Sequence, residues 1–548
     1  MRPHALIAVT VTCWLAAVPV VAQEESHEHH HAEPEVLGRV HFPVTCKPEL
    51  QPAFDRAVAL LHSFGYELAR QAFADVATQD PACGMARWGV AMTYYHPIWA
   101  PPTPAELAAG RTAAEEAARV GARSERERGF IAAVGAFYRD SDKLDHRTRA
   151  LAYKAGMEKV AAAFPDDDEA ALFYALSLLG TAPPTDTTYA NQKKAAEIAN
   201  RLLPKYPDHP GILHYIIHSF DYPELASLAL PAARAYSKVA PSSPHALHMP
   251  SHIFTRLGLW QESIASNLAS AAAAKAQMAR SHPGATSFDN LHALDYLEYA
   301  YLQLGDDRKA RQVLEEVAKA SRFDEANFAA GYSLVAVPAR YALERRDWRA
   351  AAALAPPAAE LPWERFSYAR GITSLTNVIG AARLGELDRS RKGLADLEML
   401  HAALLKEPPA GPYDWAGNVE AMRLAAGGWV AFAEGRKEEA VKLLTAAADK
   451  EDAVGKHPVT PGAVLPAREQ LGDLLLELGK PREALAAYEA SLANAPKRFN
   501  GLAGAARAAE LAGEPARARV FYQELLALCG PSCERPEAGR AKAVVSGR

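Results

Sequence analysis

The stretch LGDLLLELGKPREALAAYEASLANAP, from Leu471 to Pro496, decides the fold of this chain. Two amphipathic patterns with helical spacing flank a turn at Gly479. Alanine and leucine, which favour helix, dominate both patterns, and runs of β-branched residues are scarce along the whole chain. A pair of short helices cannot bury its apolar faces alone, so we expect neighbouring units of the same kind to stack against it.

This unit resembles the tetratricopeptide repeat, a helix-turn-helix unit of about 34 residues. The residues that match the packing and terminal positions of the family are Leu471, Gly472, Leu475, Ala484, Tyr488 and Pro496. The resemblance implies an all-α fold, a superhelical α-solenoid with a concave groove. The chain as a whole looks like an exported bacterial member of this family, and such arrays are commonly scaffolds that bind a peptide or a partner protein.

Weaker copies of the unit cover most of the chain. Five of them keep the turn and the start of the second helix, namely LGLWQESIA (257–265), LGDDRKARQVL (304–314), LERRDWRAAAAL (343–354), LGELDRSRKGL (384–394) and AEGRKEEAVKLL (433–444). We expect about ten to twelve helix pairs between Pro48 and Leu528.

Five segments are expected along the chain. The apolar run ALIAVTVTCWLAAVPVV near the N-terminus looks like a secretory signal with cleavage after Ala22, which predicts a periplasmic or secreted protein. The segments are a signal peptide (1–22), a histidine-rich flexible segment (23–47), an N-terminal array with a histidine-lined groove (48–290), a C-terminal array (291–530) and a flexible tail (531–548). The second segment contains HEHHHAE (27–33), a composition that chelates divalent metals or serves as a solvated linker.

Four cysteines remain after the expected cleavage, and their even number fits an oxidising compartment. We expect two disulfides, Cys46–Cys83 at the start of the array and Cys529–Cys533 at its end. Four free thiols, or metal ligation by the second pair, are the alternatives.

Composition argues against several classes of function. The net charge is −5, and the sequence has no long basic patch with interleaved aromatic residues of the kind that binds nucleic acid. After the N-terminal run, no segment reaches the ~18 apolar residues of a membrane span. No phosphate loop, dinucleotide fingerprint or G-x-S-x-G elbow is present.

Two histidine pairs stand out within the repeats. LHYIIHSF (213–220) and LHMPSHIF (247–254) both read L-H-x-x-x-H-x-F and begin 34 residues apart, in the register of the repeat. The resemblance places the second, fifth and ninth positions of each first helix in the groove. The main groove histidines are therefore expected to be His214, His218, His248 and His252.

Other residues fall in or near the same frame. His245 and His292 take the second position of their repeats, Asp295 takes the fifth, and Asp221 lies one turn after His218. These four residues are candidates for additional ligands or for groups that orient a ligand.

Histidines at i and i+4 share one helix face, so both rings can approach one ion. Imidazole suits zinc or copper, and neighbouring first helices pack at about 8–10 Å, which opposed rings can span. Four histidines predict a closed tetrahedral site, whereas three leave a coordination position open. The sequence thus favours a solenoid that binds zinc or copper in its groove.

Three observations keep alternatives open. Repeat duplication alone can copy a histidine pair, and such a pair is often a polar surface feature or a satisfied interior pair. Pro250 lies inside the second motif and should kink its helix. A scaffold that binds a peptide or partner without metal, and a metal-dependent enzyme of unknown reaction, remain as alternatives.

An aromatic stretch near the N-terminus offers a second candidate surface. RWGVAMTYYHPIW places Trp88, Met92, Tyr95 and His96 near groove positions, where they could form a ligand wall. Ordinary helix packing against the proline-rich joint that follows is the default interpretation.

Overall fold

The computed structural model describes residues 35–98, 101–406, 413–530 and 533–547. In that part of the chain the regular structure is helical, and the only β-type pairing is an isolated bridge between Thr286 and Phe323. The expected signal peptide and the HEHHHAE tract lie outside the described residues. Among the described helices, none combines the length and the apolar character that a membrane crossing requires.

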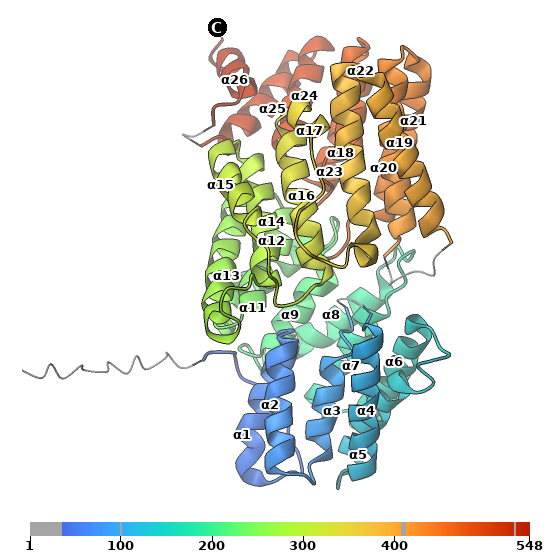
Figure 1. Ribbon diagram of the computed structural model, residues 1–548. Helices are drawn as coiled ribbons and strands as arrows, with labels where there is room; N and C mark the ends of the chain where they lie inside the picture. Colours follow the sequence, from blue (N-terminus) through green and yellow to red (C-terminus); the bar gives the residue numbers. More distant parts are fainter. Residues whose placement is uncertain (1–34, 99–100, 407–412, 531–532, 548) are drawn as a thin grey trace, which may run out of the picture. The chain divides into compact units, whose positions relative to one another are not determined.

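Helices up to Ser281 form six consecutive pairs, with α11 and α12 acting together as one broken first helix (Figure 1). They are α1 (Gln51–His62) and α2 (Tyr66–Gln79), α3 (Gly84–Thr93) and α4 (Pro104–Val120), α5 (Glu125–Tyr138) and α6 (His146–Ala163), α7 (Asp168–Gly180) and α8 (Ala190–Leu202), α9 (Pro210–Phe220) and α10 (Leu230–Val239), and α11 (Pro244–His248) with α12 (Pro250–Arg256) and α13 (Trp260–Ser281). Two short 3-10 turns, η1 (Pro48–Leu50) and η2 (Ala226–Ala229), precede α1 and α10.

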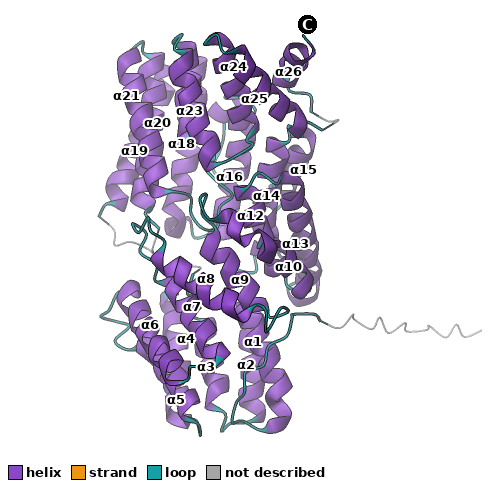
Figure 2. Ribbon diagram, turned by 180° about the vertical axis from the view of Figure 1, so that it is seen from behind, coloured by secondary structure: helices purple, strands orange, loops and turns teal. Residues whose placement is uncertain are grey.

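Six further pairs and a final helix follow (Figure 2). They are α14 (Phe288–Gln303) and α15 (Asp307–Val317), α16 (Phe328–Glu344) and α17 (Trp348–Ala352), α18 (Ser367–Leu384) and α19 (Leu387–Leu404), α20 (Trp415–Ala433) and α21 (Lys437–Val454), α22 (Ala467–Glu477) and α23 (Pro481–Asn494), α24 (Phe499–Leu511) and α25 (Pro515–Leu528), and α26 (Pro536–Ser546). A 3-10 turn, η3 (Trp363–Phe366), precedes α18. The twelve pairs in the described part confirm the predicted all-α solenoid.

The unit that decided the fold shows why its residues are needed. Gly479 turns between α22 and α23 with φ +71°, a left-handed conformation that glycine adopts without strain. A Cβ on Gly472 would lie 2.7 Å from the ring of Tyr488, so only glycine lets the two helices approach this closely. Ala484 is fully buried in the same interface.

Three apolar clusters line the stack of pairs. The first extends from Leu37 to Phe254, the second from Tyr332 to Ala541, and a smaller one from Trp260 to Tyr341 bridges them. The division expected after residue 290 falls inside α14, and Val36–Arg548 forms one compact unit. The first change of cluster comes about thirty residues earlier, between α12 and α13.

Both ends of this unit differ from the flexible segments expected there. Phe42 is fully buried among the rings of Phe54, Trp88 and Phe130, so the described part of 23–47 packs on the first helices. At the other end, α26 replaces the expected tail of 531–548 and buries Ala538 against its neighbours. The sequence prediction missed both because single apolar anchors give no periodic signal.

The structure contains both expected disulfides. Cys46 is joined to Cys83 with a Cα–Cα distance of 4.9 Å, and Cys529 is joined to Cys533 with 5.3 Å. The first bond ties the N-terminal segment to the start of α3, and the second closes a loop between α25 and α26.

Candidate metal centre

Two neighbouring first helices carry the L-H-x-x-x-H-x-F motifs. Helix α9 begins at Pro210, whose fixed φ suits a first helical turn, and carries His214 and His218. Helix α11 begins at Pro244 in the same way and carries His248. Helix α9 contacts α12, and α11 contacts α14, so residues from three repeats meet here (Figures 1 and 2).

Pro250 breaks the second motif between its two histidines. Helix α11 ends at His248 and α12 starts at Pro250, because proline has no N–H to donate to the carbonyl of Ala246. The break does not separate the pair, since Nε2 of His248 lies 3.0 Å from Nε2 of His252.

The structure divides six histidines into two triads. The first triad is His214, His218 and His245, and the second triad is His248, His252 and His292. Within each triad, one nitrogen from every ring lies within 4.8 Å of the other two. Five of the six side chains are buried and His218 is half-buried, so this part of the expected groove is closed rather than open to solvent.

The first triad converges through its Nε2 atoms. Nε2 of His214 lies 3.0 Å from Nε2 of His218 and 3.2 Å from Nε2 of His245, which comes from the next repeat. The ring of Phe64 packs on all three, with centroid distances of 4.3, 5.6 and 5.6 Å. Phe64 therefore forms an apolar wall on one side of the triad.

The second triad draws its third member from α14. The ring of His292 lies beside that of His248 with a centroid distance of 4.0 Å. Tyr296, one turn later on α14, contacts the rings of His248 and His252 at 4.8 and 5.0 Å. Its hydroxyl donates to the carbonyl of Thr460, which belongs to the loop between α21 and α22. A buried aromatic wall thus faces this triad as well.

Oxygen acceptors fix the tautomers of the HxxxH pair in the second triad. Nδ1 of His248 lies 2.6 Å from Oδ1 of Asn267, whose amide nitrogen donates to the carbonyl of Ser263. Nδ1 of His252 lies 3.0 Å from Oδ2 of Asp221. Both oxygens can only accept, so each Nδ1 carries the hydrogen, and the Nε2 atom of each neutral ring keeps a lone pair. The same argument holds for His214, whose Nδ1 donates to the carbonyl of His62 at 2.7 Å.

The contact between His248 and His252 therefore brings two lone pairs together. Such a contact is repulsive unless a cation, either a proton or a metal ion, lies between the nitrogens. Burial disfavours the proton: it lowers the pKa of His248 well below the usual value, and it lowers the pKa of His252 although Asp221 acts in the opposite direction. Two ligands of one metal ion fit this geometry better than a hydrogen-bonded pair.

The remaining rings share this electrostatic state. Burial lowers the pKa of His214 to about 3, and burial together with the neighbouring histidines holds the pKa values of His218, His245 and His292 well below their usual range. Neutral imidazole is the form that binds metals, so both triads are in a ligating state at neutral pH.

The two triads are neighbours. The ring centroids of His218 and His252 are 6.4 Å apart, and those of His245 and His248 are 6.3 Å apart. A single site made by the four motif histidines was expected, but the structure instead completes each HxxxH pair with a third histidine. The sequence placed His245 and His292 only as additional candidates, because the sharing of ligands between adjacent helices depends on tertiary packing.

Asp221 lies outside both triads and orients one of their rings. Besides His252, its carboxylate accepts from Nε of Arg256 at 2.9 Å and from Nζ of Lys456 at 3.0 Å. These cations hold the pKa of Asp221 well below its usual value despite burial, so the group is ionised. Lys456 reaches the site from the loop that also contains Thr460, a contact that no repeat pattern predicts.

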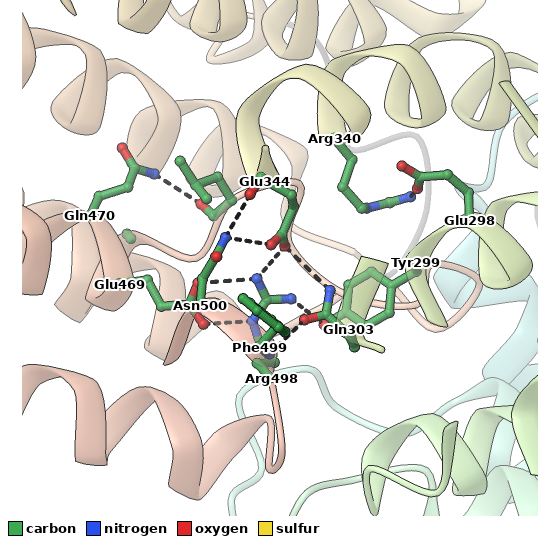
Figure 3. A network of polar contacts seen from close by, with 12 residues as sticks. Glu298, Tyr299, Gln303, Arg340, Glu344, Glu469, Gln470, Arg498, Phe499 and Asn500 are labelled. Carbon is green, nitrogen blue, oxygen red and sulfur yellow. Dashed lines mark hydrogen bonds and ion pairs between the residues drawn. The ribbon is translucent and has the colours of Figure 1, made fainter. Parts of the chain in front are cut away.

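Asp295 is drawn away from the triads. Its carboxylate accepts from Nη1 of Arg340 at 2.8 Å, and Glu298 accepts from the same atom at 2.7 Å. Close by, Arg498 pairs with Glu344 and Glu469 in a second buried ion network (Figure 3). These networks brace α14, the helix that carries His292, against α16, α22 and α24.

The aromatic stretch near the N-terminus does not form a groove wall. Trp88, Met92 and Tyr95 are fully buried in the first apolar cluster, as ordinary helix packing predicts. His96 lines a cavity, where its ring packs on Tyr66 with a centroid distance of 4.5 Å.

A third polar cluster lies behind the first triad. Oε2 of Glu169 lies 3.0 Å from Nε2 of His62, and its Oε1 lies 3.0 Å from Nε2 of His209. The hydroxyl of Tyr215 lies 2.8 Å from Nδ1 of His62. Spacing along the chain gave no signal for this cluster, because its residues come from three different helices or their borders, α1, α7 and α9.

Comparisons with known proteins identify no family for this chain. No protein-family profile matches this sequence, and none of the curated proteins compared with it matches. Among solved structures, the chain is similar to the APC/C hetero-tetramer Cut9–Hcn1, with 12% identity over 90% of this chain and 89% of that chain and a TM-score of 0.31. It is also similar to a monomeric mutant of IFIT1 with m7Gppp-AAAA, with 11% identity over 81% of this chain and 90% of that chain and a TM-score of 0.35.

Proposed function

We propose that this protein holds two transition-metal ions side by side, one in each triad. The observation that carries this proposal is the 3.0 Å contact between Nε2 of His248 and Nε2 of His252, with both Nδ1 hydrogens committed to oxygen acceptors. A metal ion is the cation that satisfies both lone pairs in a buried site.

The donor set favours copper, with zinc as the alternative. Each triad offers three neutral imidazoles, and no carboxylate of the described residues belongs to either triad. Calcium and magnesium need oxygen ligands, whereas imidazole suits copper and zinc, and among divalent ions copper binds most tightly to a given nitrogen site. Three protein ligands leave an open position at each ion, which is the arrangement of reactive rather than purely structural sites.

The site bears differently on the two alternatives, a scaffold that binds a peptide or partner and a metal-dependent enzyme. The helix faces expected to hold an extended peptide are buried at the triads, so a peptide would not lie on these histidines. A metal-dependent reaction stays compatible, because three protein ligands leave a coordination position for a substrate at each ion. Export remains part of the proposal, supported by the signal-like N-terminus and by two disulfides, which persist in oxidising compartments.

Elemental analysis of the purified chain tests the proposal. To remove the N-terminal tract as a source of metal, the background carries serine at four positions, which are His27, His29, His30 and His31. We expect two copper or zinc ions per chain in this background, and about one in each of His214→Ala and His292→Ala. The control His146→Ala, a half-buried histidine on α6 outside both triads, should keep two ions. Equal metal content in all four proteins would overturn the proposal.

A further inference from the structure

A small cavity opens beside the first triad. The volume within it that the centre of a water molecule can occupy is about 20 Å³. This is enough for one water molecule or for the end of a slender chain. The residues that line it are Phe64, Tyr66, His96, His245, Phe288, Asp289 and Glu325. Because His245 belongs to the first triad, the cavity borders a proposed metal ligand.

The walls of this cavity are aromatic. The ring of Phe64 stacks on that of Tyr66 at 5.4 Å and on that of His245 at 5.6 Å, so one continuous π surface extends toward the triad. Tyr66 in turn packs on His96. Such a surface favours an apolar stem and also attracts a cation placed over a ring face.

The polar lining is acidic. Asp289 is half-buried, and burial together with the carboxylates of Asp324 and Glu325 raises its pKa to about 7. Within the described residues, neither Asp289 nor Glu325 forms an ion pair with a lysine or arginine, although Arg70 lies near enough to lower the pKa of Glu325. A bound cation would relieve the repulsion among these carboxylates.

We propose that the cavity binds the ammonium end of a primary amine and holds its carbon chain against the first triad. The carboxylates of Asp289 and Glu325 accept hydrogen bonds from the ammonium group, and the rings of Phe64 and Tyr66 cover the adjacent methylenes. The small volume favours this compact group over a planar guanidinium. That a primary amine is also the substrate of the metal centre rests on the proposed function.

Binding of n-butylammonium to the metal-free full-length protein tests the cavity without reference to metal. Calorimetric titration should detect binding to the wild type, and Asp289→Asn should weaken it at least about tenfold, since the charged acceptor is replaced by a neutral amide oxygen. Glu325→Gln, at an exposed position, should weaken binding in the same direction even if Asp289→Asn fails to fold. The control Asp388→Asn, at a fully exposed position on α19, should leave the affinity unchanged, and n-butanol should not bind.

Equal affinities in the wild type, Asp289→Asn and Glu325→Gln, or comparable binding of n-butanol, would overturn the cavity proposal. The metal content of the same preparations separates the two proposals, because amine binding without metal uptake contradicts only the metal centre. In copper-loaded protein, n-butylammonium should shift the visible absorption of the metal, and Asp289→Asn should suppress the shift. Amine binding without that shift would overturn the assignment of the amine as substrate.

Discussion

Replacing Asp221 is expected to weaken the second triad without removing a metal ligand. Its carboxylate accepts from Nδ1 of His252 at 3.0 Å and balances the buried cations Arg256 and Lys456. Asp221→Asn keeps the shape and one acceptor oxygen but loses the charge that makes His252 a better electron donor. Asp221→Ala removes the acceptor as well, so the ring loses both its tautomer and its orientation.

The magnitude follows from the role of such partners. Loss of a group that orients a metal-bound histidine costs about 10- to 100-fold in metal affinity. We expect about tenfold for Asp221→Asn, because its amide oxygen can still accept from His252, and about a hundredfold for Asp221→Ala. Only the ion in the second triad should be affected, since His214 takes its orienting bond from the carbonyl of His62.

Competition with a chelator of known affinity measures this effect as two separate release steps. A matched control is Asp307→Asn, since Asp307 also accepts from two arginines, Arg345 and Arg535, but contacts no histidine of either triad. Unchanged affinity at both ions in Asp221→Ala, with the fold retained by circular dichroism, would refute the role of Asp221 in orienting His252.

Three further predictions concern stability and processing. Burial lowers the pKa of His457 to about 3, so between pH 6.5 and 4 the unfolded chain binds a proton that the folded protein does not. As the pH falls through this range, the free energy of unfolding therefore decreases by up to about 1.4 kcal/mol per pH unit. His457→Phe should remove this contribution from the free energies measured by urea titration at several pH values, and an unchanged slope against pH would contradict the assignment. Arg498→Met leaves the buried carboxylates of Glu344 and Glu469 without their cation and should lower the free energy of unfolding by about 3–5 kcal/mol in the same urea titration. The control Arg517→Met removes an exposed ion pair and should cost less than about 1 kcal/mol. Equal losses in the two variants would show that the buried network does not stabilise the fold. The exported protein should begin at Gln23 by mass spectrometry, and retention of residues 1–22 would count against a cleaved signal.

The sequence predicted the elements of the site better than its assembly. The pairs at His214 and His248 could be placed because spacings of four and 34 residues survive folding as a shared helix face. The third ligand of each triad could not be assigned, because His245 and His248 lie one turn apart on the same helix yet turn to different triads. That choice depends on how adjacent repeats are rotated against each other.

Contacts between residues far apart in the sequence are the second feature that the repeat pattern could not predict. Asp295 occupies a repeat position expected to face the groove, yet its carboxylate accepts a hydrogen bond from Arg340, 45 residues away. Lys456 reaches Asp221 across 235 residues from a loop with no repeat signal. The open groove expected from the register is consequently filled at the triads by side chains and a loop that periodicity does not describe.

The most direct test is to locate the metal by anomalous diffraction from crystals grown with copper. The account predicts two peaks, one in each triad, each bonded to three histidine Nε2 atoms at about 2.0–2.1 Å. A single peak shared by His214, His218, His248 and His252 would restore the one-site arrangement and contradict the paired centre. No peak near any of the six histidines would contradict metal binding in the fold altogether.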